Sequence, residues 1–249
     1  MAGYCVGVDG CRKGWVSVAL RDLHAPHLMV HEDMHALWRE HDSADIILID
    51  MPIGLLESGV SERECEYEAR RLLGTRRSSV FPVPCRDAVY AARNEEAMAV
   101  NLERTGRQLS LQSLAIRGKI RQVDELLRKD ERARRLFKEV HPELLFCGMN
   151  NGYAMLHHKK GRPGRLERLS LLSEIAGERI VDAVMAQAKT YRRRDLAWDD
   201  IIDALAAAVA ASHPKELLSI PENPPLDAHG LPMQMVYLQR SSTRRTQHA

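Results

Sequence analysis

The segment WDDIIDALAAAVAA at residues 198–211 constrains the fold more strongly than any other part of the sequence. After Asp203 it has no polar face, and a helix that is apolar all round is a buried helix. Asp199 is sufficient to cap the start of this helix, where the helix dipole favours negative charge. Asp200 and Asp203 follow one turn apart. We expect Asp203 to be buried, where an unpaired carboxylate is costly and needs a partner such as a metal ion.

Strand patterns dominate the first fifty residues. Apolar runs at 4–9, 14–20, 27–32 and 45–50 predict four strands, with a short helix near 34–41. The last of these runs, DIILID, is apolar on both faces, which is typical of a strand in the middle of a sheet. A further strand is predicted at 136–140, ended by the His-Pro step that follows it. A C-terminal hairpin, LLSIP with MQMVY, is expected to close the sheet.

Helical patterns fill most of the remaining sequence. They predict helices at 61–74, 87–104, 110–130, 164–176, 178–193 and 199–212, with Ser110 as a cap and Gly74 as a stop. This order favours a single α/β domain over residues 1–240, in which helices flank a mixed sheet and residues 61–130 form a helical insertion or cap. Residues 241–249 are expected to form a disordered basic tail.

Composition excludes several classes of protein. The 36 Lys and Arg residues nearly balance the 34 Asp and Glu residues, so the net charge does not by itself call for nucleic acid. Arginine-rich stretches, one of them at 158–168, are candidate anion-facing patches or simply solvated surface. Five cysteines without a Cys-x-x-Cys pair indicate neither a disulfide framework nor a structural zinc site. With no signal peptide and no membrane-spanning run, we expect a cytoplasmic protein that does not insert into membranes.

Acids follow several of the predicted strands. Asp9 ends the first strand, Asp50 ends the fourth, and Glu143 comes one turn after the fifth. Ligand sites in open α/β sheets lie beyond the carboxyl ends of strands, so these acids can converge, and Asp200 and Asp203 can complete the cluster. Clustered carboxylates repel one another unless a cation neutralises them, and Mg²⁺ or Mn²⁺ prefers oxygen ligands. Two such ions roughly 3.5–4 Å apart can cleave a phosphodiester.

Each strand-end acid also has a purely structural interpretation. Asp9 followed by glycine fits a tight turn between two strands, and Asp50 precedes a Met-Pro turn. Glu143 follows a proline at a helix start, where the dipole favours an acid. These alternatives stay open for each residue taken alone. The combination of all the acids favours a functional site.

The motif order strengthens that interpretation. VGVDG at 6–10, ILIDMPIGL at 47–55 and DIIDALAAAV at 200–209 resemble the RNase H-like superfamily, in particular the RuvC-type nucleases. The resemblance implies an RNase H-like fold and a metal-binding set of Asp9, Asp50, Asp200 and Asp203. RuvC resolvases carry Glu where this chain has Asp50. They act as dimers, which makes a homodimer an open alternative, although no sequence feature marks a dimer face.

A second resemblance covers nearly the whole chain. GVDGCRKGW, IDMPIGL, RRSSVFPVP, LSLQSLAIRGKI, EVHPELLF and DDIIDALAAA, in this order, are similar to the family called domain of unknown function four-twenty-nine, described as predicted RNase H-fold nucleases. That description is itself an inference from fold, so the resemblance bears on the fold more than on the activity. The family pattern also gives weight to Glu143.

Five further residues are candidates for binding substrate. Arg76, Arg77 and Ser79 lie in RRSSVFPVP, whose guanidinium and hydroxyl groups suit a phosphate. The same stretch is equally well explained as a loop that packs its apolar side chains under the cap. Lys119 and His141 are the other two candidates, and a histidine before proline is commonly structural. Aromatic residues are scarce, which argues against broad single-strand binding by base stacking.

The predicted function is metal-dependent hydrolysis of phosphodiester bonds in a nucleic acid or nucleotide substrate. Mg²⁺ or Mn²⁺ would be bound by Asp9, Asp50, Glu143 and Asp203, with Asp200 binding or orienting it. A nucleotide-dependent phosphotransferase of the actin-like group is the first alternative, although the chain has one such core and no convincing glycine-rich phosphate loop. The second alternative is a binding protein in which the acids form a structural metal site and the arginines recruit a nucleic acid or protein partner.

Overall fold

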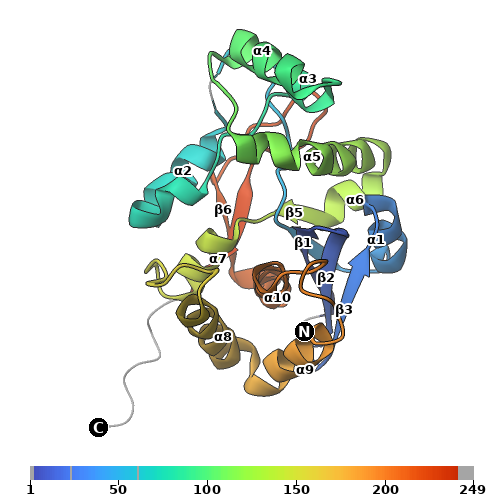
Figure 1. Ribbon diagram of the computed structural model, residues 1–249, viewed down its shortest axis with the longest axis vertical. Helices are drawn as coiled ribbons and strands as arrows, with labels where there is room; N and C mark the ends of the chain where they lie inside the picture. The colour runs from blue at the N-terminus through green and yellow to red at the C-terminus, as the bar shows by residue number, and fades with distance from the viewer. Residues whose placement is uncertain (1–2, 23, 61, 241–249) are drawn as a thin grey trace.

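A five-stranded mixed sheet lies at the centre of the protein (Figure 1). The computed structural model describes residues 3–22, 24–60 and 62–240, so the predicted tail at 241–249 lies outside the described residues. In space the strands run β3-β2-β1-β4-β5, with β1, β2 and β3 antiparallel, β4 parallel to β1 and β5 parallel to β4. The strands are β1 (Tyr4–Cys11), β2 (Gly14–Arg21), β3 (His24–His31), β4 (Ile46–Ile49) and β5 (Phe137–Glu139).

Helices cover both faces of this sheet, which confirms the predicted α/β class. They are α1 (Met34–His41), α2 (Glu64–Leu73), α3 (Arg86–Tyr90), α4 (Asn94–Thr105), α5 (Leu111–Lys129), α6 (Glu131–Leu136), α7 (Pro142–Met149), α8 (Arg162–Ala176), α9 (Glu178–Ala188) and α10 (Trp198–Ala211), with short 3₁₀ helices η1 (Gly74–Ser79) and η2 (Pro214–Glu216). Among the described residues no helix is both long and apolar enough to cross a membrane.

Alternation along the central strands separates two apolar cores. In β4, Ile46 and Leu48 belong to one core with α7, α8, α9 and α10, whereas Ile47 and Ile49 belong to the other with α1 and α5. Successive side chains of a strand point to opposite faces of the sheet, so one continuous apolar run fills both cores. This confirms the central position predicted for the DIILID strand.

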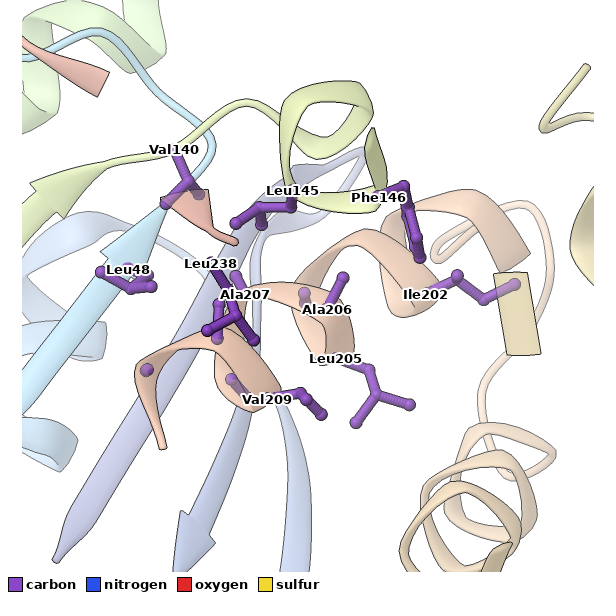
Figure 2. Close-up of a cluster of buried hydrophobic side chains, with 14 of the residues drawn as sticks. Leu48, Val140, Leu145, Phe146, Ile202, Leu205, Ala206, Ala207, Val209 and Leu238 are labelled. Atoms are coloured by element: carbon purple, nitrogen blue, oxygen red, sulfur yellow. The ribbon is translucent and has the colours of Figure 1, made fainter. Parts of the chain in front are cut away.

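Helix α10 packs directly on β1, as its apolar sequence required. Residues 201–211 are all buried. A Cβ on Gly7 of β1 would lie 2.1 Å from both the carbonyl oxygen of Ala204 and the amide nitrogen of Ala208, so only glycine allows this approach. Figure 2 shows other α10 side chains in one apolar cluster with Leu145 and Phe146 of α7. The helix therefore lies between the sheet and a second helical layer.

On the opposite face of the sheet a buried polar network joins α1 to β1, β2 and β3. The Tyr4 hydroxyl lies 2.5 Å from Nδ1 of His41, and Nε2 of His41 lies 2.9 Å from the Ser17 hydroxyl. Nε2 of His31 lies 2.8 Å from the same hydroxyl. Burial, together with the neighbouring His31, lowers the pKa of His41 to about 3. His41 is therefore a neutral imidazole at physiological pH.

Helices α2 to α6 occupy the chain between β4 and β5, where the sequence predicts a helical insertion. In the view of Figure 1 helices α2 to α5 lie above the sheet, and α8 and α9 lie below it. Ser110 caps α5 and Gly74 follows the end of α2, as predicted. The single helix predicted at 87–104 is wrong, because the chain breaks between α3 and α4. Arg117 donates to the carbonyl oxygens of Ala88 and Ala91 at this break, so these groups need no helical partner.

The C-terminal hairpin does not extend the main sheet, contrary to the prediction. Strands β6 (Leu217–Ile220) and β7 (Met235–Leu238) pair with each other as a separate two-stranded antiparallel sheet. β7 packs against α7, where Gly148 allows close approach because a Cβ there would lie 2.3 Å from the carbonyl oxygen of Leu238. The apolar face of β7 is thus buried by a helix, and pairing with β5 is not needed to bury it.

Candidate functional site

Two of the predicted acids meet at the carboxyl ends of β1 and β4. Val8 pairs with Ile49 in the parallel register, so Asp9 and Asp50 are the next residues in line. The amide of Asp50 donates to the carbonyl oxygen of Val8 over 2.9 Å, which fixes the backbone there. Side chains alternate across a strand, so both acids point to the face that α10 covers. Asp203 precedes Ala204, the α10 residue that touches β1, and α10 therefore brings a third acid to the same place.

Burial and mutual repulsion dominate the electrostatics of these three acids. Asp9 is 8% exposed and Asp203 is 2% exposed. Burial raises the pKa of Asp9 well above its usual value, and the charges of Asp50 and Asp203 raise it further. Burial also raises the pKa of Asp50 to about 7, against the attraction of the nearby Lys159 ammonium. The cluster cannot be fully ionised at neutral pH without cations beside it.

Lys159 supplies one cation to the cluster. Its Nζ donates to Oδ2 of Asp203 over 2.7 Å, and the neighbouring carboxylates raise its pKa despite burial. The other oxygen of Asp203, Oδ1, is buried and finds no hydrogen-bond partner among the described residues. The sequence singled out this region only as a basic patch at 158–168. Lys159 is therefore a site residue that the sequence reasoning missed.

The segment that presents this amine, residues 150–161, is called here the Lys159 loop. Arg76 of η1 donates to two consecutive carbonyl oxygens of the loop at 2.8–3.1 Å. Glu167 of α8 accepts hydrogen bonds from two consecutive loop amides at 2.8 and 3.0 Å. Arg76, predicted as a phosphate ligand, thus holds the loop in this structure, and the backbone that leads to Lys159 is bound from both sides.

Glu143 lines the same region but has a partner of its own. Its Oε1 accepts from Nη2 of Arg168 over 2.6 Å, and Arg168 is 1% exposed. Arg168 also donates to the carbonyl oxygens of His157 and Gly164, which ties α8 to the Lys159 loop. The charge of Glu143 is therefore balanced by a buried arginine, and its predicted role as a metal ligand stays a prediction.

A further buried acid, Glu139, ends β5 beside the cluster and was also missed. It pairs in register with Ile49, one position before Asp50, so its side chain points to the opposite face of the sheet. Arg63 donates to both of its oxygens at 2.7 and 2.8 Å, and the amide of Ile53 donates to one of them over 2.7 Å. This bidentate pair braces the loop that follows β4. The sequence feature that could have indicated Glu139 is its position as an acid at the end of a predicted strand, like Asp9 and Asp50.

A cleft of about 700 Å³ opens over the cluster, between the sheet ends, η1, α5 and the Lys159 loop. Acids and bases both line it. The charged lining residues are Asp9, Asp50, Arg63, Arg76, Lys119, Glu139, Glu143, Lys159, Lys160 and Asp199. Asp203 lies beneath this lining and reaches the cleft through Lys159.

The sequence matches the model of the family described as Protein of unknown function (DUF429) over residues 7–226. The chain belongs to the DUF429 family. The family predicted from the ordered motifs is thus confirmed, and the matched region includes every acid of the cluster as well as Lys159. No curated protein and no solved structure matches this DUF429 chain.

Of the remaining predicted residues of this DUF429 protein, some line the cleft and others lie outside it. Ser79, Lys119 and His141 line the cleft, whereas Arg77 is exposed and is not among its described lining residues. Asp200 likewise lies outside that lining, and its Oδ2 accepts from the amide of Ala197 over 3.1 Å as a cap of α10. Burial raises the pKa of Asp200 to about 6.

Two of the cleft residues have structural partners. Lys119 donates to the carbonyl oxygen of Gly14 and lies over the Trp15 ring, 4.6 Å from its centroid. Nε2 of His141 lies 3.2 Å from the carbonyl oxygen of Ser79. Burial lowers the pKa of His141 to about 4, so this imidazole is neutral at physiological pH. Both residues help to shape the cleft wall.

The donor set of the cluster suits a hard divalent cation. Within residues 3–22, 24–60 and 62–240, no three His, Cys, Asp or Glu side chains are grouped closely enough to hold a metal ion. Asp9, Asp50 and Asp203 nevertheless offer only carboxylate oxygens, which Mg²⁺ and Mn²⁺ prefer. The buried Oδ1 of Asp203, without a described partner, is the observation that fits such an ion. In this DUF429 structure the cation that meets the cluster is the Lys159 ammonium.

Proposed function

We propose that this DUF429 protein hydrolyses phosphodiester bonds of a nucleic acid or nucleotide, using Mg²⁺ or Mn²⁺ held by Asp9, Asp50 and Asp203. One observation carries the proposal: three acids from β1, the end of β4 and α10 converge under one cleft, and a buried oxygen of Asp203 lacks a described partner. A bound divalent ion would supply an activated water and stabilise the charge that develops on the leaving oxygen.

Residues of the chain itself supply the remaining parts of the site. Lys159 lines the cleft beside the acids and provides positive charge for a phosphate. The volume of about 700 Å³ is within the usual range of ligand sites. Burial of Asp9 and Asp203 beneath the cleft strengthens the electrostatic interactions of the cluster.

An RNase H-like fold belongs to the same proposal. It is supported by the order of the acids, one at the first strand, one after the fourth strand and one on a late helix, which is the order that the resemblance to RuvC-type nucleases implies. The mixed sheet that brings these positions together supports the assignment. The depth of α10 in the core also supports it, because this packing places Asp203 beside the strand ends.

The experiment combines metal binding with cleavage. Mn²⁺ is titrated by calorimetry into the parent, Asp203→Asn and Asp182→Asn, the last being a matched control on an exposed position of α9. The three proteins are then incubated with Mn²⁺ and labelled single- and double-stranded DNA, RNA, an RNA–DNA hybrid and bis(p-nitrophenyl) phosphate. We expect the parent and the control to bind Mn²⁺ and to cleave at least one of these diesters. Loss of a ligand should slow cleavage by Asp203→Asn by at least about a hundredfold, since changes to residues that merely orient ligands already cost 10–100-fold.

Two outcomes would overturn the proposal. One is a parent that binds no Mn²⁺ and cleaves none of the diesters, and the other is Asp203→Asn cleaving at the parental rate. ATP hydrolysis without diester cleavage would instead support the actin-like phosphotransferase.

A non-catalytic binding module is a second candidate, favoured by one specific observation. The Lys159 ammonium already provides a cation to Asp203, so the acids can serve as a structural ion-pair cluster without metal. This function predicts metal-independent binding of nucleic acid or protein and no turnover. The cleavage screen above separates the two functions.

A further inference from the structure

In the ion pair between Lys159 and Asp203, only one of the two carboxylate oxygens of Asp203 has a hydrogen-bond partner among the described residues. Oδ2 accepts from Nζ over 2.7 Å, whereas Oδ1 is buried and has no partner within the described chain. A carboxylate that bridges two metal ions with one oxygen on each uses both oxygens. Here a fixed ammonium has taken one of them, and a single oxygen is left for a metal.

The charge balance leads to the same conclusion. The three acids proposed to face the metal, Asp9, Asp50 and Asp203, contribute three negative charges when ionised, and Lys159 contributes one positive charge. Asp200 also acts on Asp9, but it caps the first turn of α10 and is not counted among the ligands. The remainder of two negative charges is neutralised by one divalent ion. A second divalent ion would give the buried cluster a net positive charge.

The Lys159 loop is built to hold the amine at this position. Arg76 and Glu167 bind its backbone from two different elements. Gly164 of α8 lets the loop approach closely, because a Cβ there would lie 2.2 Å from the carbonyl oxygen of His158, the residue before Lys159. The next residue, Lys160, is exposed and has no carboxylate partner in the described part of the chain. Of the two lysines, Lys159 therefore forms an ion pair with the cluster and Lys160 does not.

We propose that the Lys159 ammonium takes the place of a second metal ion, so that the site binds one divalent cation instead of two. This inference rests on the proposed function, because it concerns how the same acids would hold their metal. In the two-ion arrangement each ion stabilises charge on one of the exchanging oxygens. The ammonium supplies a fixed positive charge and hydrogen-bond donors at one of these places.

The test measures the number of Mn²⁺ ions bound per chain, by calorimetry and by electron paramagnetic resonance, in the parent, Lys159→Met, Lys159→Arg and Lys160→Met. We expect one ion in the parent, in Lys159→Arg and in the Lys160→Met control. Lys159→Met should bind two ions with the spectrum of a spin-coupled pair. It should also bind the first ion on the order of tenfold more tightly, because a like charge has been removed. Circular dichroism confirms that each variant is folded.

The outcomes separate this inference from the proposed function. Two ions in the parent would overturn the role of Lys159 and leave a metal-dependent hydrolase standing, and this result does not require any variant to fold. A folded Lys159→Met that still binds one ion with parental affinity would also overturn it. A parent that binds no Mn²⁺ would defeat the metal-dependent function itself, and the inference with it.

Discussion

The buried His41 makes the stability of the protein depend on pH. Its imidazole is buried between Tyr4 and Ser17, and burial lowers its pKa to about 3, compared with an unfolded value of about 6.5. The unfolded state therefore binds more protons than the folded state between these two values, and stability falls as the pH falls through this window. The slope is about 1.4 kcal/mol per pH unit, which amounts to a loss of about 3 kcal/mol between pH 7 and pH 4.

Comparison with His41→Gln isolates this contribution. Urea unfolding is followed by circular dichroism at pH 7, 6, 5 and 4, and the free energy of unfolding of the variant is subtracted from that of the parent at each pH. Titration of the aspartate cluster is common to both proteins and cancels. We expect the parent to lose about 3 kcal/mol more than His41→Gln over this range. His35→Gln, on the exposed side of α1, is the matched control and should follow the parent. A difference between parent and His41→Gln that stays constant within about 0.5 kcal/mol from pH 7 to pH 4 would refute the reasoning.

Three further predictions concern packing and the cleft. Gly7→Ala should destabilise the protein by about 3 kcal/mol or more in urea unfolding, because its Cβ would overlap the α10 backbone. Gly118→Ala on α5, with open space around it, should be neutral or stabilising by up to about 1 kcal/mol. Unfolding of Gly7→Ala at the parental midpoint would contradict this. Glu143→Gln should cost about 3 kcal/mol in the same assay by leaving a buried arginine unpaired, and a large loss of Mn²⁺ affinity without loss of stability would instead identify it as a ligand. Arg76→Ala should speed amide hydrogen exchange in the Lys159 loop, and unchanged exchange there would show that the clamp is not needed.

The parts of the fold that the sequence predicts well are those in which a local pattern decides the structure. The run DIILID needs burial on both faces wherever it lies, and the alanine-rich half of α10 has no polar face to expose. Asp9 and Asp50 follow such strands directly, so their places at the strand ends follow from the strands themselves. The hairpin was misplaced because β7 carries the same apolar signal whether it borders a sheet or a helix. The packing of β7 against α7 decides between these two positions, and this packing cannot be read from the sequence of β7 alone.

The missed parts of the site depend on contacts between distant segments. Lys159 lies in a loop without periodicity, and nothing in its neighbourhood distinguishes it from the exposed Lys160. Arg76 suits a phosphate and a backbone carbonyl equally well, so its clamp on the loop appears only when η1 and the loop are placed side by side. Glu139 is the last residue of β5, and Glu143 follows the same strand at the start of α7. The register with β4 and the position of Arg168 are needed to tell their environments apart.

The contact at Gly7 has a consequence for how the chain is made. Strand β1 leaves the ribosome early and α10 late, so one face of the sheet stays without its helix until nearly the whole described chain has been synthesised. Non-local pairings of this kind fold slowly and leave apolar surface open to aggregation in the meantime. Because the helix that closes this face also brings Asp203 to Asp9, the carboxylate cluster forms in the same event that completes the core. The carboxylate site of a nascent chain is therefore assembled only when the chain reaches its fully folded state.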